Sequence, residues 1–553
     1  METKSCSNTH TKTNTLIIII IIIIIMSSSS VLSFSSLFPA MEFSISLQLL
    51  LLSLSIVSIF FYYKPTSKKT NKSSTKVHTL FGVLPELLKN SHRFLEWASE
   101  KLISSPTNTA VLRLPGGLQG VMTANPSCVE HILKDNFENY PKGDVFNTYF
   151  LDFFGGGLFT SDGEVWKVNR KVANHALNTK SYRSFMMNNV AGELETKLVP
   201  ILENASKTGE VFDLEHVLER FGFDNVFKVA FGFELGCLEG DGSVIGYEFL
   251  RAYEDATKIS TLRSMYPAFW WKTKRFLNVG SEKRLKEATK TLQGFVDNIV
   301  QTRIKGTKTR PEGGVPDLLD RLMAMHDNDG NYYSAEFHRN MTIGVILAAQ
   351  DTTVSALTWF FWLVATRPEI QNAIVKELES IRGRREPQNK HDFSYSYEEI
   401  RDMNYLQAAI SESMRLYPPA PTTSRSCADD DVFPDGTFVK KGSVVIYNAY
   451  AMGRMESLWG ETWAEFRPER WLGQDGVFKP DNPYKYPIFN AGPRMCVGID
   501  IGYIQMKYIA ATVIERFEIN LQDKERVPQI LFWFTLGMKG GLPVTIEARK
   551  SSI

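Results

Sequence analysis

The chain has 553 residues, of which 43% are hydrophobic and 22% charged, and its formal net charge is +1. This composition is typical of a globular protein, and a charge so close to neutral gives no indication of a nucleic-acid partner. The five cysteines are widely spaced and form no Cys-x-x-Cys pair, which argues against a disulfide framework or a zinc site and favours a reducing compartment.

The first apolar run near the amino end is Leu16–Ile25. Its ten residues are too short to cross a bilayer. It belongs to residues 1–40, which we interpret as an N-terminal extension, either a disordered or targeting segment or an artefact of the gene model that precedes a second start at Met41.

The second apolar run predicts a membrane anchor. Ile45–Tyr63 contains nineteen residues without a charge, and Lys64 and four further lysines up to Lys76 follow it. This length matches the hydrocarbon core, and lysines on one flank favour the cytoplasmic side. We therefore expect one transmembrane helix at residues 41–64, with a cleaved signal peptide as the alternative. Residues 65–79, rich in Lys, Ser and Thr, are expected to be a linker.

Residues 80–553 are expected to form one large catalytic domain, because no second linker or repeat follows. Apolar residues three and four apart predict helices at Leu194–Leu202, Leu214–Ala230 and Arg284–Arg303. Strand-like runs are short and few, and they lie at Ala110–Leu114, Gly120–Thr123, Ser443–Tyr447 and Leu542–Ile546. Many helices and a minor sheet, without regular alternation of strand and helix, predict a mostly α fold.

The segment Met341–Ala365 is long and apolar enough to resemble a second membrane span. Its centre contains Asp351, however, and an aspartate at the bilayer midplane costs about 2.5–3.5 kcal/mol. We therefore expect a central helix that is buried in protein and whose acidic residue has a functional role.

The most specific motif is Phe489–Gly498, with the sequence FNAGPRMCVG, followed by a helical run at Ile499–Phe517. Its Phe, Gly, Arg, Cys and Gly stand at the offsets of the haem-ligand loop of cytochromes P450, and the chain resembles that family from about residue 80 to residue 547. The other segments that match, in the order of the family, are Gly163–Arg170, Ala348–Thr353, Glu412–Arg415 and Phe466–Trp471.

The resemblance implies that Cys496 binds the iron of haem b as a thiolate. A position just before a helix favours its negative charge. In the family, the two glycines of the motif let the backbone turn beside the flat macrocycle, the phenylalanine shields the sulfur, and the Trp and Arg residues reach the propionates. The implied cofactor-binding residues are Trp166, Arg170, Arg425, Phe489, Gly492, Arg494, Cys496 and Gly498. A lone cysteine is otherwise a small buried hydrophobe, and Gly163–Arg170 alone would be an ordinary surface helix.

On the oxygen side, the resemblance assigns catalytic roles to Thr352 and Asp351. Thr352 would hydrogen-bond the dioxygen and Asp351 would help to relay protons. The alternative for Thr352 is a hydroxyl that bonds a carbonyl of its own helix. Ala349 stands where the family has glycine, and its methyl group is expected to alter coupling or the position of the substrate.

The resemblance also implies a buried structural network of Glu412, Arg415 and Arg470. Taken alone, the Glu412–Arg415 pair would be a surface salt bridge of small consequence.

Four further segments are similar to a plant subgroup of the family. They are Asn139–Gly143, Phe223–Val226, Phe433–Thr437 and Tyr447–Arg454. That subgroup contains fatty-acid ω-hydroxylases, hydroxylases of jasmonoyl–amino acid conjugates and enzymes that oxidise the end of sterol side chains. The implied activity inserts one atom of O2 into a terminal or near-terminal C–H of an aliphatic chain.

The implied partners are a hydrophobic small molecule, the endoplasmic reticulum membrane and the NADPH–cytochrome P450 reductase. The catalytic domain would face the cytoplasm, and Lys167 and Lys171 would contact the reductase unless they only form a solvated helix face. Parts of 145–160, the central helix and Thr535–Leu536 are expected to line the substrate pocket. Two rival functions remain, a haem-thiolate isomerase of hydroperoxides that needs no reductase and a non-catalytic haem-binding carrier or sensor.

Overall fold

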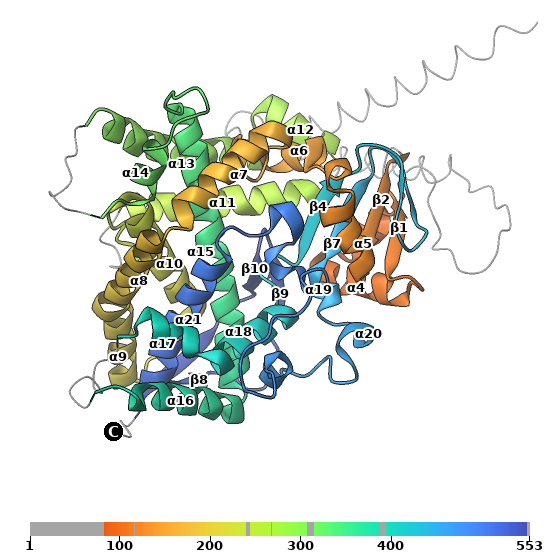
Figure 1. Ribbon diagram of the computed structural model, residues 1–553. Helices are drawn as coiled ribbons and strands as arrows, with labels where there is room; N and C mark the ends of the chain where they lie inside the picture. The colour runs from red at the N-terminus through yellow and green to blue at the C-terminus, as the bar shows by residue number, and fades with distance from the viewer. Residues whose placement is uncertain are drawn as a thin grey trace, which may run out of the picture. The chain divides into compact units, whose positions relative to one another are not determined.

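Helices make up most of the described chain, as predicted (Figure 1). The computed structural model describes residues 82–114, 117–238, 244–266, 268–306, 315–386 and 394–549, so the predicted extension, anchor and linker lie outside the described residues. The helices of the first half are α3 (Leu84–Lys89), α4 (Phe94–Ser104), α5 (Pro126–Glu130), α6 (Gly143–Phe154), α7 (Gly163–Leu177), α8 (Lys180–Glu193), α9 (Val199–Thr208), α10 (Leu214–Phe231), α11 (Val244–Met265), α12 (Ala268–Leu277), α13 (Gly280–Ile304) and α14 (Leu318–Met323). Those of the second half are α15 (Ala335–Ala365), α16 (Pro368–Gly383), α17 (Tyr397–Asp402), α18 (Asn404–Leu416), α19 (Ala449–Met452), α20 (Glu456–Trp459) and α21 (Ile499–Arg516).

The strands form small sheets. They are β1 (Thr109–Arg113), β2 (Gln119–Thr123), β3 (Phe212–Asp213), β4 (Thr422–Ser426), β5 (Asp431–Val432), β6 (Phe438–Val439), β7 (Val444–Asn448), β8 (Phe517–Leu521), β9 (Ile530–Phe532), β10 (Leu536–Met538) and β11 (Pro543–Ala548). The largest sheet has the order β1-β2-β7-β4, with β2 and β7 parallel and the other pairs antiparallel. The predicted strands correspond to β1, β2, β7 and β11, each displaced by about one residue.

The predicted helices are confirmed, with two differences. Leu194–Leu202 begins with a π-helical turn, Leu194–Leu198, before α9 starts. The last helix ends at Arg516, because Phe517 has an extended backbone (φ −133°, ψ 150°) and becomes the first residue of β8, where it is buried.

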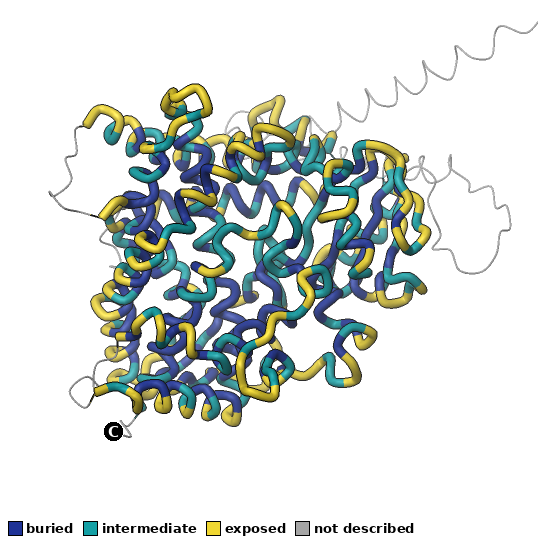
Figure 2. The backbone as a smooth tube through the Cα atoms, in the orientation of Figure 1, coloured by how far each residue is buried: buried dark blue, intermediate teal, exposed yellow. Residues whose placement is uncertain are grey.

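Helix α15 lies between the four-stranded sheet and the helices α8 to α10 (Figure 1), and its carboxyl half is buried along its length (Figure 2). The Ser334 hydroxyl caps it by accepting a hydrogen bond from the Phe337 N–H. Trp359, Phe360 and Phe361 are fully buried. Among the described helices, α15 is the one long and apolar enough to span a membrane, but 67% of its most apolar window is buried. The structure therefore agrees with the predicted core helix.

Candidate functional site

The loop that carries Cys496 is closed by its own backbone. The Cys496 N–H donates to the Phe489 carbonyl at 2.8 Å, and the Asn490 amide donates to the Arg494 carbonyl at 3.1 Å. The Tyr447 hydroxyl donates to the Asn490 side chain at 2.9 Å, which ties the loop to β7. The loop leads directly into α21, so Cys496 lies just before a helix, as the motif predicted.

Gly492 is required by a close approach between two backbone segments. Its φ is +64°, and a Cβ atom there would lie 2.0 Å from the Leu133 carbonyl oxygen. Gly498 differs, because its φ of −96° suits any residue. A Cβ at Gly498 would lie 4.0 Å from the Cys496 sulfur, so glycine there leaves space beside that atom.

Cys496 is accessible to water and yet surrounded by protein. It counts as exposed, while burial raises the pKa of its thiol. A side chain that faces a space inside the protein explains both its accessible surface and the effect of burial on its pKa. The Gly498 N–H and the Arg170 guanidinium act in the opposite direction and lower the pKa of the same thiol. A sulfur atom that is accessible from inside the protein and has these neighbours is suited to bind a metal as a thiolate.

Arg425, Arg494 and Lys142 form a cluster of cationic side chains at the Cys496 loop. Arg425 is 1% exposed, and its Nε and one terminal nitrogen have no hydrogen-bond acceptor within the described chain. The Nε of Arg494 is also buried without an acceptor. Burial and the neighbouring Arg425 lower the pKa of Arg494 to about 10. Burial and both arginines hold the pKa of Lys142 well below its usual range. Buried guanidinium N–H groups need hydrogen-bond acceptors. The carboxylates of a haem carry the opposite charge and have enough oxygen atoms to accept these hydrogen bonds.

Asp162 organises this cluster, although sequence reasoning missed both Asp162 and Lys142. Its carboxylate accepts hydrogen bonds from the backbone N–H of Lys142 at 2.8 Å and of Gly143 at 2.9 Å, and from the Arg494 guanidinium at 2.5 Å. An aspartate before a helix usually caps that helix, so the local sequence held no signal for this role.

The two predicted residues of α7 lie one turn apart beside the loop. The Arg494 guanidinium carbon is 4.4 Å from the centre of the Trp166 ring, which packs on Phe137 with ring centroids 5.5 Å apart. Arg170 is half-buried and acts electrostatically on the Cys496 sulfur. The structure therefore brings Trp166, Arg170, Arg494 and Cys496 together.

Thr352 and Asp351, the residues predicted to act on the oxygen side, are half-buried on α15. The Thr352 hydroxyl donates to the Ala348 carbonyl at 2.6 Å, as in the alternative of a hydroxyl bonded within its own helix. Its oxygen can still accept a hydrogen bond. Burial raises the pKa of Asp351 to about 7, and the Tyr253 hydroxyl faces its carboxyl group. Among the described contacts, none joins these residues to the Cys496 loop.

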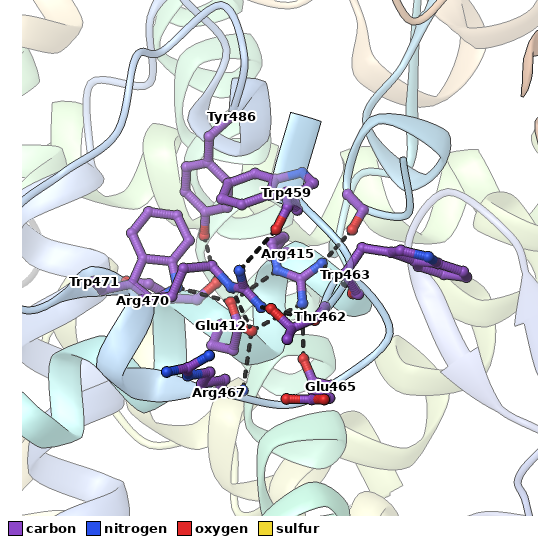
Figure 3. Close-up of polar contacts among 12 residues, drawn as sticks. Glu412, Arg415, Trp459, Thr462, Trp463, Glu465, Arg467, Arg470, Trp471 and Tyr486 are labelled. Atoms are coloured by element: carbon purple, nitrogen blue, oxygen red, sulfur yellow. Dashed lines mark hydrogen bonds and ion pairs between the residues drawn. The ribbon is translucent and has the colours of Figure 1, made fainter. Parts of the chain in front are cut away.

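The predicted structural network is confirmed (Figure 3). Glu412 and Arg415 are both fully buried and form two hydrogen bonds of 2.8 Å. Arg470 donates to the same carboxylate at 3.2 Å and Trp471 at 2.8 Å. The remaining Arg415 donors reach carbonyl oxygens of Gly453, Trp463 and Glu465. Glu412 thus joins α18 to the chain that leads to the Cys496 loop.

Comparison with known proteins gives a consistent result. The family model described as Cytochrome P450 matches residues 73–543. The chain is 47% identical to "Cytochrome P450 CYP94D108" of Paris polyphylla over 85% of this chain and 91% of the relative. It is 41% identical to "Cytochrome P450 94A1" of Vicia sativa (86% and 91%) and 39% identical to "Cytochrome P450 94B1" of Arabidopsis thaliana (88% and 93%).

Proposed function

The chain belongs to the cytochrome P450 family and is a monooxygenase, and we propose that Cys496 is the thiolate that holds the iron of its haem b. The observation that carries this proposal is the water-accessible Cys496 sulfur beside two buried arginines, Arg425 and Arg494, that retain guanidinium N–H groups without an acceptor in the described chain. Arg425 and Arg494 would bind the propionates, and Trp166 and Arg170 would complete that side. Phe489 would shield the sulfur, while Gly492 and Gly498 would shape the loop around it.

We propose that the substrate is an aliphatic chain hydroxylated at or near its end. An aromatic wall supports this proposal. Phe534, next to the predicted pocket segment Thr535–Leu536, packs on Phe150 and Phe154 of α6 with ring centroids 5.7 and 5.1 Å apart. Phe154 packs on Phe159, which lies against Gly344 of α15. Such aromatic side chains would offer apolar surface to a substrate and no specific partner to a polar group.

The reaction divides between the haem and the chain. The haem, when bound, supplies oxygen activation and radical chemistry. Cys496 holds the iron and the aromatic wall excludes water from the substrate. Thr352 and Asp351 would deliver protons to the oxygen site, for which a carboxyl group with a pKa of about 7 is well suited. Electrons would come from NADPH through the reductase. Lys167 is exposed but paired with Glu164 at 2.7 Å, so Lys171 presents the less neutralised charge to that partner.

A face near α12 supports membrane attachment of the catalytic domain. Phe269 is 62% and Phe276 89% exposed, and Trp270 and Leu277 are exposed beside them. The cations of the same helix are Lys272, Lys274 and Arg275. Exposed aromatic residues interleaved with cations are typical of a surface at the lipid headgroups. We propose the endoplasmic reticulum membrane, with residues 41–64 as the anchor.

The substrate proposal is tested by expressing the chain in microsomes with the reductase. Products would be analysed for a fatty acid, a jasmonoyl–amino acid conjugate and a sterol with an intact side chain. Oxidation of a terminal or near-terminal carbon with NADPH is the expected result. Isomerisation of a fatty-acid hydroperoxide without NADPH, or no turnover of any substrate despite a full haem content, would contradict it.

Restoring the family's glycine by Ala349→Gly should change coupling. Ala349 and Gln350, which directly precede Asp351 and Thr352, line a cavity between α10, α15 and α21. Loss of the Ala349 methyl group would give that cavity more room and change the packing of α15 next to the two proposed proton donors. We expect the amount of product per NADPH consumed to differ by about twofold or more, which corresponds to only ~0.4 kcal/mol. Ala348→Gly, at the neighbouring position, controls for the loss of helix propensity. Equal coupling in wild type and Ala349→Gly would contradict this prediction.

Replacing Arg425 by leucine should weaken haem retention. A hydrogen bond to a charged group contributes ~1.5–3 kcal/mol, so the rate of haem transfer to apomyoglobin should rise about tenfold or more. Arg251→Leu, on the exposed side of α11, is the matched control. An unchanged transfer rate in Arg425→Leu would remove this residue from the haem site.

A further inference from the structure

The carboxylate of Asp152 on α6 is bound by two arginines from other helices. Arg263 of α11 donates to it at 2.8 Å, and Arg275 of α12 donates to its two oxygens at 2.9 and 3.3 Å. The Asp152 backbone carbonyl accepts a hydrogen bond from the Gln293 side chain of α13 at 3.2 Å. These contacts form the Asp152 clamp, through which α11, α12 and α13 all hold α6.

The two arginines of the clamp differ in their surroundings. The Arg263 side chain is 3% exposed, donates to Glu282 of α13 through its Nε at 3.0 Å, and has its guanidinium carbon 4.7 Å from the centre of the buried Trp271 ring. The Arg275 side chain is 55% exposed. An exposed ion pair is weak and screened by salt, whereas removing one partner from a buried pair is costly. The bond to Arg263 is therefore the fixed half of the clamp, and the bond to Arg275 is the half that can open.

The charges of the clamp balance when both arginines are bound. Its two cations are Arg263 and Arg275, and its two carboxylates are Asp152 and Glu282. If Arg275 leaves, one cation remains for both carboxylates. The Glu282 side chain is 1% exposed and keeps Arg263, because a buried carboxylate without a cation is costly. The Asp152 side chain is 31% exposed and can move into water instead.

A movement of Asp152 would displace the aromatic wall. Phe150 and Phe154, which pack on Phe534, flank Asp152 on the same helix. The start of α6 is held separately, because the Gly143 N–H donates to the Asp162 carboxylate at 2.9 Å. Opening of the clamp would therefore turn α6 about its fixed start and shift the end that carries the two rings.

We propose that the Asp152 clamp positions the wall of the substrate pocket and opens at Arg275 to admit an apolar substrate past α6. When the clamp is closed, it holds Phe150 and Phe154 in the wall. When Arg275 releases, Asp152 moves toward water and the end of α6 moves with it. This inference rests on the proposed aliphatic substrate, and it gives Asp152 a positioning role through α6.

The first test measures how fast a saturated fatty acid binds to the haem-loaded chain, followed by the change in haem absorbance. Arg275→Gln should raise both the association and the dissociation rate about threefold and leave Kd within about twofold, as loss of an exposed ion pair predicts. Raising the salt from about 0.05 to about 0.5 M should have the same effect on the wild type and little effect on Arg275→Gln. Lys274→Gln is the matched control, because it removes the same charge from α12 but Lys274 lies over the Trp270 ring.

Asp152→Asn removes the charge that both arginines bind. With NADPH and reductase, we expect the KM for the fatty acid to rise about tenfold, the usual effect of losing charged hydrogen bonds, and kcat to stay within about twofold. A merely structural role would lower kcat together with the amount of folded enzyme. The double variant Asp152→Asn/Arg275→Gln should bind the substrate no faster than Asp152→Asn alone, since both changes remove one shared interaction.

A readout that does not depend on the substrate is hydrogen exchange of the amides in residues 143–154. Asp152→Asn should speed this exchange about tenfold, and Lys274→Gln should match the wild type. Unchanged exchange in Asp152→Asn, or equal binding rates in Arg275→Gln and Lys274→Gln, overturns the proposal. If no fatty acid alters the haem absorbance of the wild type, the proposed substrate fails, and faster exchange in Asp152→Asn would then still support the clamp.

Discussion

Replacing Cys496 by alanine should remove the reduced, carbon-monoxide-bound absorption band that marks thiolate ligation. Monooxygenase turnover should fall by more than ~100-fold, because loss of an outer-shell partner of a metal already costs ~10–100-fold and Cys496 is the proposed ligand itself. A thiolate at this position would also supply the electron density that a bound haem needs for oxygen activation. The measurement is the difference spectrum of the purified chain at equal haem content, followed by NADPH-dependent turnover.

The matched control for this prediction is Cys427→Ser. Cys427 is buried and is distant from the Cys496 loop in the sequence. Its sulfur lies 2.9 Å from the Asp429 carbonyl oxygen, so a serine hydroxyl can replace it. We expect Cys427→Ser to retain the thiolate band. A Cys496→Ala protein that still shows this band, or a wild-type chain that binds no porphyrin under haem-replete expression, would remove the basis of the proposed site.

The sequence predicted local geometry well where that geometry depends on neighbours along the chain. The residues of the Cys496 loop stand at fixed offsets, and the structure closes that loop by the hydrogen bond between Cys496 and Phe489. The buried Glu412–Arg415 pair could be inferred for a similar reason, because residues three apart share a helix face.

Functions that depend on packing between distant segments could not be predicted. Asp162, which directly precedes α7, joins the start of α6 to Arg494, and no local pattern distinguishes it from an ordinary helix cap. Gly492 was predicted to let the backbone turn beside the haem; the structure shows in addition that it lies against the Leu133 carbonyl, which is far away in the sequence.

Glu412→Ala should lower the free energy of unfolding by ~3–5 kcal/mol, the usual cost of breaking a buried ion pair from one side. Arg415 is fully buried and would keep its charge without a carboxylate, and the donors of Arg470 and Trp471 would lose their acceptor. Because Glu412 also accepts the Arg467 backbone N–H at 3.0 Å, the segment before the Cys496 loop should loosen. The measurement is urea unfolding of the haem-loaded chain, followed by haem absorbance and tryptophan emission.

Glu465→Ala provides the control for Glu412→Ala, since Glu465 is exposed and contributes to the network only through its backbone carbonyl. Its free energy of unfolding should stay within ~0.5 kcal/mol of the wild type. Glu412→Gln should fall between the two, because an amide oxygen still accepts hydrogen bonds but leaves both guanidinium charges without a counterion. Equal stability of Glu412→Ala and Glu465→Ala would show that the buried pair does not stabilise the fold. The Coulomb attraction of the pair would then only offset the cost of removing both charges from water.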